Sequence, residues 1–271
     1  MREGPPARTL VDSPSANPHR AECPTTGGQL SRITFVHAHP DDETIATGAL
    51  IAQLVERGHA VSVLTATRGE LGDVVPGPLS HLAGTPELVA HRENELDAAL
   101  ATLGVTEHAF LGDPPARDGI GSRHYRDSGM AWVSEGVAGP AESSDERSFC
   151  AAEEADVVAD MIAWLRHVDA ELVITYDADG GYGHPDHVRC HHLARTAADV
   201  LAREFAVVVH EPGEDVLWLD LERHLPVVIR ALEQHASQVS VDGTTLTHSG
   251  GQSEPVRTSV GLRGDTGRIS A

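Results

Sequence analysis

Short apolar runs alternate with longer amphipathic stretches along this chain, and that alternation limits the possible folds more than any other feature. Residues 32–37 are predicted to form a strand, residues 43–57 carry a helical stripe that ends at Gly58, and residues 60–66 are predicted to form the next strand. Parallel strands joined through a helix are expected to cross over right-handedly. The first 70 residues therefore predict one β-α-β unit.

The alternation continues along most of the remaining chain. We expect further helices near residues 86–103, 151–167, 186–203 and 221–239, and further strands near residues 108–111, 171–176 and 205–209. This pattern is typical of an α/β protein with a doubly wound, mostly parallel, Rossmann-like sheet in a single domain.

Segments at both ends and in the middle do not fit the alternation. We expect residues 1–30 to be a disordered extension and residues 31–240 to be the domain, and we leave the Gly-, Ser- and Thr-rich tail 241–271 unassigned. Residues 112–149 are too long for a passive connection, so we expect substrate contacts there.

Charge and cysteine content exclude several classes of protein. The 41 acidic residues against 20 basic ones give a formal charge of -21, which repels phosphate backbones and anionic lipids, so we expect neither nucleic acid nor a membrane as partner. Cys23, Cys150 and Cys190 form neither a disulfide framework nor a thiolate zinc site. A cytoplasmic protein is expected, while its oligomeric state does not follow from the sequence.

Two clusters of histidine and aspartate each follow a predicted strand. The first is HAHPDDET at residues 37–44, and the second is GHPDH at residues 183–187. Open α/β sheets bind ligands at the carboxyl ends of their strands. Two imidazoles, one carboxylate and an open position are typical of a hydrolytic zinc site.

Each cluster alone has a simpler interpretation. Two aspartates at the start of a helix often only cap it, and a lone histidine pair is often a surface feature. Their joint occurrence at two strand ends favours a metal site. His37, the first residue of this cluster, is the last residue of the predicted strand 32–37 and is expected to be structural or exposed.

The strings AHPDDE at residues 38–43 and GGYGHPDH at residues 180–187 resemble the LmbE-like (PIG-L) family of zinc-dependent N-acetyl deacetylases. The resemblance covers residues from about 32 to 205, and a weaker similarity is found near residues 234–239. It implies that His39, Asp42 and His187 are the zinc ligands and that Asp41 is the general base. The same ligand set also accepts ferrous iron.

The chemistry of that family suggests roles for three further residues. His184, held by Asp186, would be protonated and would stabilise the oxyanion or act as the acid. Tyr182 would donate a second hydrogen bond to the oxyanion. The alternative for Tyr182 is an aromatic side chain packed within its loop.

Three further strings resemble the deacetylases of mycothiol biosynthesis, which act on N-acetylglucosaminyl-inositol: RGELGD at 68–73, HRENEL at 91–96 and RDSGM at 126–130. This resemblance implies that Asp73, Arg92 and Asp127 bind the hydroxyl groups of a small amino-sugar substrate. For Arg92 the alternative is a surface ion pair with Glu93 or Glu95.

The chain departs from those deacetylases in two places. It has Asp73 where they carry Glu, and the region between Phe205 and the last predicted helix is shorter. An amidase of mycothiol conjugates and a deacetylase of amino-sugar natural products therefore remain alternatives. A non-catalytic sugar-binding protein is a third, but it would need neither Asp41 nor His184.

Overall fold

A seven-stranded sheet forms the centre of the computed structural model, which describes residues 30–134, 137–139, 141–142 and 144–270. The strand order is β3-β2-β1-β6-β7-β12-β8. The first five of these strands run parallel, and β12 pairs antiparallel with both β7 and β8. The strands are β1 (Arg32–His37), β2 (Ala60–Thr65), β3 (Glu107–Phe110), β6 (Leu172–Tyr176), β7 (Glu204–Val209), β8 (Leu217–Asp220) and β12 (Ser259–Gly264).

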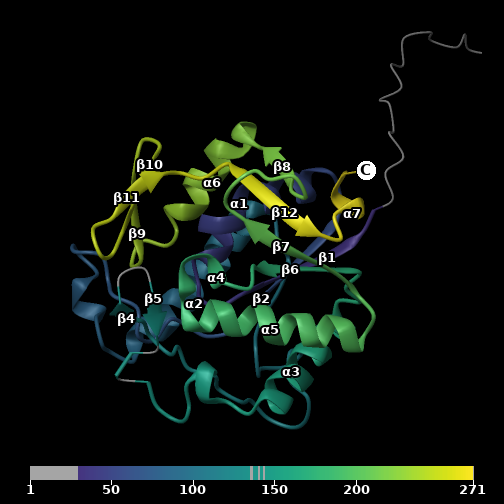
Figure 1. Cartoon of the computed structure of the whole chain (residues 1–271). Coiled ribbons are helices and arrows are strands. Elements are labelled where there is room, and N and C mark those ends of the chain that lie inside the picture. The colour runs from purple at the N-terminus through teal and green to yellow at the C-terminus, as the bar shows by residue number, and fades with distance from the viewer. Residues whose placement is uncertain (1–29, 135–136, 140, 143, 271) are drawn as a thin grey trace, which may run out of the picture.

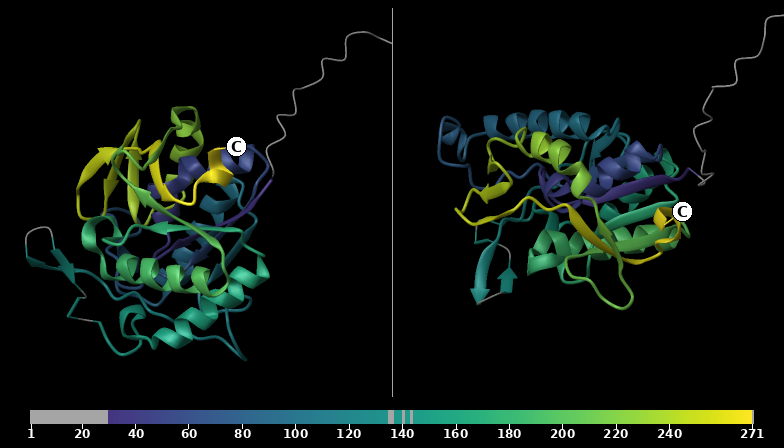
Figure 2. Two further views of the ribbon diagram at one scale, coloured as in Figure 1. Left: turned by 45° about the vertical axis from the view of Figure 1, so that its right-hand side comes forward. Right: turned by 90° about the horizontal axis from the view of Figure 1, so that it is seen from above.

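Helices cover both faces of this sheet (Figures 1 and 2). On one face lie α1 (Asp42–Glu56), α2 (Glu87–Leu103) and α6 (Leu225–Leu232), and on the other lie α3 (Glu154–His167) and α5 (Pro185–Val200). Shorter helices are α4 (Gly180–Gly183), α7 (Gly267–Ser270) and the 3-10 turns Ser80–Leu82, Phe149–Ala151 and Glu222–His224. The predicted doubly wound, mostly parallel α/β fold is confirmed.

Strand β1 shows how the sequence produces two apolar cores. Ile33 and Phe35 are buried in the core beneath α1, α2 and α6. Val36 lies in the opposite core, and Thr34 accepts a hydrogen bond from Trp164 Nε1 of α3 at 2.9 Å. Successive strand side chains point to opposite faces, so one short run serves both layers. Burying each large apolar side chain contributes about 1.5–3 kcal/mol.

The C-terminal region differs most from the prediction. The helix expected over 221–239 is the shorter α6, and the unassigned tail forms strands. A three-stranded antiparallel sheet consists of β9 (Val239–Asp242), β10 (Thr245–His248) and β11 (Ser253–Pro255). Strand β12 then enters the main sheet, where Val260 and Leu262 are buried. The domain's sheet therefore extends beyond residue 240.

The long segment 112–149 contains a small strand pair, β4 (Ala131–Ser134) and β5 (Val137–Gly139). Among the described residues, no helix combines the length and apolarity that a bilayer crossing requires. The predicted N-terminal extension lies outside the described residues up to position 29.

Candidate metal centre and active site

The two loops that carry histidine and aspartate meet because β1 and β6 are neighbours in the sheet. Both strands run in the same direction, so their carboxyl ends open at one edge. Tyr176, the last residue of β6, joins the loops. Its hydroxyl accepts a hydrogen bond from Ala38 N at 2.8 Å and donates one to Asp42 Oδ2 at 2.7 Å.

Three atoms from these loops stand at the mutual distances of metal ligands. His39 Nδ1 lies 3.2 Å from Asp42 Oδ2 and 3.4 Å from His187 Nε2, and the latter two atoms are 3.3 Å apart. Ligands about 2.0–2.1 Å from a tetrahedral zinc ion stand about 3.3 Å from one another. The triangle therefore fits zinc in size, and its two imidazoles and one carboxylate leave a fourth position open.

The other side of the His39 ring faces two carboxylates. His39 Nε2 lies 3.2 Å from Asp186 Oδ2 and 3.6 Å from Asp127 Oδ1. These three residues form a second group that could hold a metal. Their carboxylates accept backbone hydrogen bonds from Ser128 and Gly129, and this group has one imidazole where the triangle has the two that are typical of a hydrolytic zinc site. They fit better as acceptors that would orient His39 if its Nδ1 bound a metal.

The carboxylates around His39 make the site suitable for a positive charge. Burial acts to lower the pKa of His39, but Asp127, Asp186 and Asp42 raise it well above its ordinary value. Burial acts in the opposite sense on Asp42, whose pKa His187 and His39 nevertheless hold well below its usual range. A metal ion would take the place of the proton on His39, since ligands bind metals in their deprotonated form.

Asp41 lies at the N-terminus of α1 in an unusual backbone conformation. Its φ is 122°, a region that residues other than glycine rarely adopt and that costs about 1–3 kcal/mol. Within the described chain its carboxylate makes no capping hydrogen bond to α1, so the capping interpretation does not hold for Asp41. Burial and the charge of Asp42 raise the pKa of Asp41 to about 7. This value suits a general base at neutral pH.

The expectation for His184 needs correction. The Asp186 carboxylate contacts His39 rather than the His184 ring, and only the backbone N–H of Asp186 donates to His184 Nδ1, at 3.2 Å. Burial and the charges of His39 and His187 lower the pKa of His184 to about 3. A pKa this low, together with the hydrogen bond that Nδ1 accepts, favours a neutral imidazole with Nε2–H as a donor over the imidazolium that the sequence predicted. Its ring centroid lies 4.6 Å from that of His39.

Tyr182 stands at the rim of the site. Its side chain is 52% exposed, and its ring meets those of His187 and His184 edge-on at centroid distances of 5.3 and 6.0 Å. This exposure argues against an aromatic packed within its loop. Donation from its hydroxyl to a substrate stays a prediction.

The three predicted substrate ligands differ in accessibility. Asp73 is exposed, whereas Asp127 and Arg92 are buried. The guanidinium of Arg92 donates to the backbone carbonyls of Gly72 at 3.1 Å, of Asp73 at 2.9 Å and of Gly69. At 1% exposure, Arg92 also cannot be the surface ion pair considered as its alternative. Its contacts favour a structural role in the loop.

Sequence reasoning missed Glu43 and His235. Both are fully buried, and His235 Nε2 lies 3.0 Å from Glu43 Oε1. Acidic residues are common in the first turn of a helix, where the helix dipole favours them, so Glu43 does not stand out in the sequence. The only sequence signal for its partner was the weak resemblance near residues 234–239.

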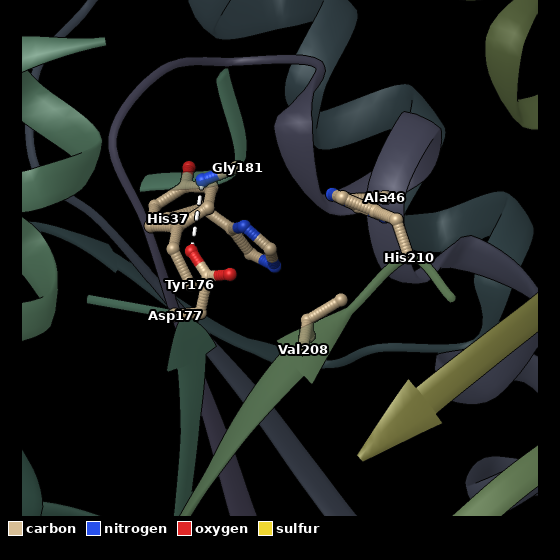
Figure 3. A pocket seen from close by; sticks show the side chains of 7 residues that line it. All are labelled: His37, Ala46, Tyr176, Asp177, Gly181, Val208 and His210. Atoms are coloured by element: carbon tan, nitrogen blue, oxygen red, sulfur yellow. Dashed lines mark hydrogen bonds between the residues drawn. The ribbon is translucent and has the colours of Figure 1, made fainter. Parts of the chain in front are cut away.

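A small cavity lies behind the site, lined by His37, Ala46, Tyr176, Asp177, Gly181, Val208 and His210 (Figure 3). Its volume of about 10 Å³ admits one water molecule but no sugar. The Thr47 hydroxyl donates its proton to the Glu43 carbonyl, so it must accept from His37 Nε2–H, at 3.0 Å. His37 Nδ1 is then a buried acceptor without a hydrogen-bond partner among the described residues. His37 is thus structural, as expected.

The chain is similar to several known proteins. The family profile described as "PIG-L: GlcNAc-PI de-N-acetylase" matches residues 34–198. A 1D-myo-inositol 2-acetamido-2-deoxy-alpha-D-glucopyranoside deacetylase of Kineococcus radiotolerans is 48% identical over 199 residues, covering 72% of this chain and 53% of the relative. A protein of the same description from Actinosynnema mirum is 35% identical, covering 83% of this chain and 88% of the relative.

Two solved structures share the fold. The zinc-inhibited form of teicoplanin deacetylase has a TM-score of 0.56 at 22% identity, covering 77% of this chain and 85% of its own. The N,N'-diacetylchitobiose deacetylase of Pyrococcus horikoshii has a TM-score of 0.52 at 21% identity, covering 76% and 70%. The chain spans about half the length of the first curated relatives that it matches.

Proposed function

Because this chain belongs to the PIG-L family of GlcNAc-PI de-N-acetylases, we propose that it is a metal-dependent deacetylase of a small N-acetylglucosamine glycoside. The curated relatives favour 1D-myo-inositol 2-acetamido-2-deoxy-α-D-glucopyranoside, an intermediate of mycothiol biosynthesis, as the substrate. The observation that carries the proposal is the triangle of His39, Asp42 and His187, with Asp41 beside it.

In this proposal His39 Nδ1, Asp42 Oδ2 and His187 Nε2 hold zinc or ferrous iron. When bound, the metal polarises the amide carbonyl and acidifies water. Asp41 takes the proton of the attacking water and returns it to the leaving amine. His184 donates its Nε2–H to the developing oxyanion, and Tyr182 supplies a second donor from the rim.

The exposed Asp73 would accept hydrogen bonds from substrate hydroxyl groups. Asp127 is oriented toward His39 and the backbone of residues 71 and 129, so its support of the substrate would be indirect. We infer a cytoplasmic site of action, which suits the free thiols of Cys150 and Cys190.

The test combines metal analysis with two substrates. Purified protein should contain about one zinc or iron ion per chain and release acetate from the inositol glycoside. Faster cleavage of a bulky mycothiol conjugate would instead identify an amidase. Tight sugar binding without acetate release would identify a non-catalytic protein and refute the proposal.

A further inference from the structure

We propose that Glu43 and His235 act as a buried pair that holds Asp41 in its working orientation. The inference rests on the proposed function, in which Asp41 is the general base. Both side chains are 0% exposed, and His235 Nε2 lies 3.0 Å from Glu43 Oε1. A buried charged pair often stabilises a fold no better than apolar residues of the same volume would. Fold stability alone therefore does not account for it.

The second oxygen of Glu43 reaches the backbone of the base. Glu43 Oε2 accepts the N–H of Asp41 at 3.0 Å, while the carbonyl of Asp41 accepts from Thr44 N at 3.0 Å and Ile45 N at 2.9 Å. Asp41 is therefore fastened on both sides of its Cα. A residue at φ 122° keeps such a conformation only where its surroundings impose it. Glu43 supplies the contact on the N–H side.

His235 in turn determines where the Glu43 carboxylate stands. It follows α6, which packs on α1 (Figure 1), and so reaches the first turn of α1 from a segment far along the chain. Thr44 Oγ1 lies 3.2 Å from His235 Nε2 and also donates to Glu43, and Gln238 Nε2 lies 3.3 Å from His235 Nδ1. The imidazole is held on both nitrogens, so the pair is rigid.

The same segment is anchored independently of the pair. Ser237 N and Oγ both donate to the Glu95 carboxylate at 2.7 Å, and Val75 N donates to Ser237 O at 2.9 Å. Within the described residues, the side-chain hydrogen bonds of Glu43 and His235 beyond the pair run to Asp41, Thr44 and Gln238 rather than to the atoms proposed to bind the metal. Loss of the pair should therefore lower kcat and leave metal content and KM nearly unchanged.

Three variants of the full-length protein separate this role from a purely structural one. His235→Leu removes the donor to Glu43. His235→Gln keeps one, because a glutamine amide nitrogen occupies about the place of imidazole Nε2. The double variant Glu43→Leu/His235→Leu replaces the pair by apolar side chains and leaves no unpaired buried charge. His224→Leu is the matched control, since His224 is a buried histidine bonded to Gln53 at the far end of α1.

Kinetics with the inositol glycoside give the first readout. We expect His235→Leu and the double variant to lose about 10- to 100-fold in kcat, with KM within about twofold and zinc content unchanged. His235→Gln should recover most of the rate, and the His224→Leu control should keep it. Wild-type kcat in the double variant, parallel loss of zinc, or no recovery in His235→Gln would overturn the inference.

Hydrogen exchange of the Asp41 amide gives a readout that needs no activity. The N–H bonded to Glu43 should exchange slowly in the wild type and in His235→Gln, and about tenfold faster in His235→Leu. If the wild type released no acetate, the proposed function would fail while amide exchange still tested the pair. An unchanged Asp41 exchange rate in His235→Leu overturns the inference in either case.

Discussion

Replacing Arg92 by methionine should destabilise the fold more than it weakens substrate binding. The guanidinium is 1% exposed and donates to the carbonyls of Gly69, Gly72 and Asp73. Methionine keeps most of the apolar stem but none of the donors. The loop would therefore lose the contacts that hold it against α2.

The size of the effect follows from the exposure of the three carbonyls. Gly72 and Asp73 are exposed, so water can replace the guanidinium there at a cost of about 0.5–1 kcal/mol each. Gly69 is buried, and its unpaired carbonyl costs about 1–3 kcal/mol. The total of about 3 kcal/mol corresponds to a melting temperature lower by roughly 6–12 °C.

Thermal unfolding and steady-state kinetics on the same samples test this prediction. Gly72→Ala is a matched second perturbation, because a Cβ there would lie 2.5 Å from Arg92 Nη1 and displace it. We expect it to lower the melting temperature as well. A melting temperature of Arg92→Met within about 2 °C of the wild type, together with a KM raised more than about tenfold, would show instead that Arg92 binds the substrate.

Three further predictions concern the general base, the bound metal and the free energy of unfolding at acid pH. Asp41→Asn should keep its metal but lose at least about 100-fold in kcat, which metal analysis and acetate release measure on the same samples. Near wild-type activity of this variant would exclude Asp41 as the general base. Chelation of the metal should lower the melting temperature of the wild type but not that of Asp42→Asn, and added zinc should restore the wild-type value. If chelation lowered the melting temperature of both proteins equally, Asp42 would not be a metal ligand. Burial lowers the pKa of His37 from 6.5 to about 4, so its neutral form contributes stability in full above pH 6.5 and loses it as pH falls through 4. Between pH 7 and pH 4, the free energy of unfolding should therefore fall by about 3 kcal/mol less in His37→Gln than in the wild type, measured by denaturant unfolding. An equal fall in both proteins would contradict the lowered pKa of His37.

Much of the fold, and the meeting of the two loops that carry histidine and aspartate, could be predicted because their signals are local. An apolar run such as residues 32–37 and the helical stripe behind it specify a β-α-β unit within a short window. The sheet order then brings the ends of β1 and β6 together, so the loops carrying His39 and His187 must meet.

The remainder depends on contacts that no local pattern shows. Glu43 lies 192 positions from His235, and Arg92 uses backbone carbonyls, which every sequence contains. The sequence does not show the contact of Asp186 for a similar reason, since its carboxylate contacts the distant His39 ring and not that of its neighbour His184. No pattern assigns the tail, because β9 to β11 have only three or four residues each and the segment is rich in Gly, Ser and Thr.

The position of β12 has a consequence for how the protein is made. Strand β12 lies between β7 and β8, so neither of those strands has its full set of partners until residues 259–264 leave the ribosome. The parallel strands β1 and β6, which lead to His39 and His187, are synthesised much earlier, and β7 remains an unpaired edge until β12 is available. Unpaired edges invite association with other chains. Nascent chains arrested before residue 259 should therefore be the aggregation-prone species during synthesis, and chaperones would have most to protect at that stage.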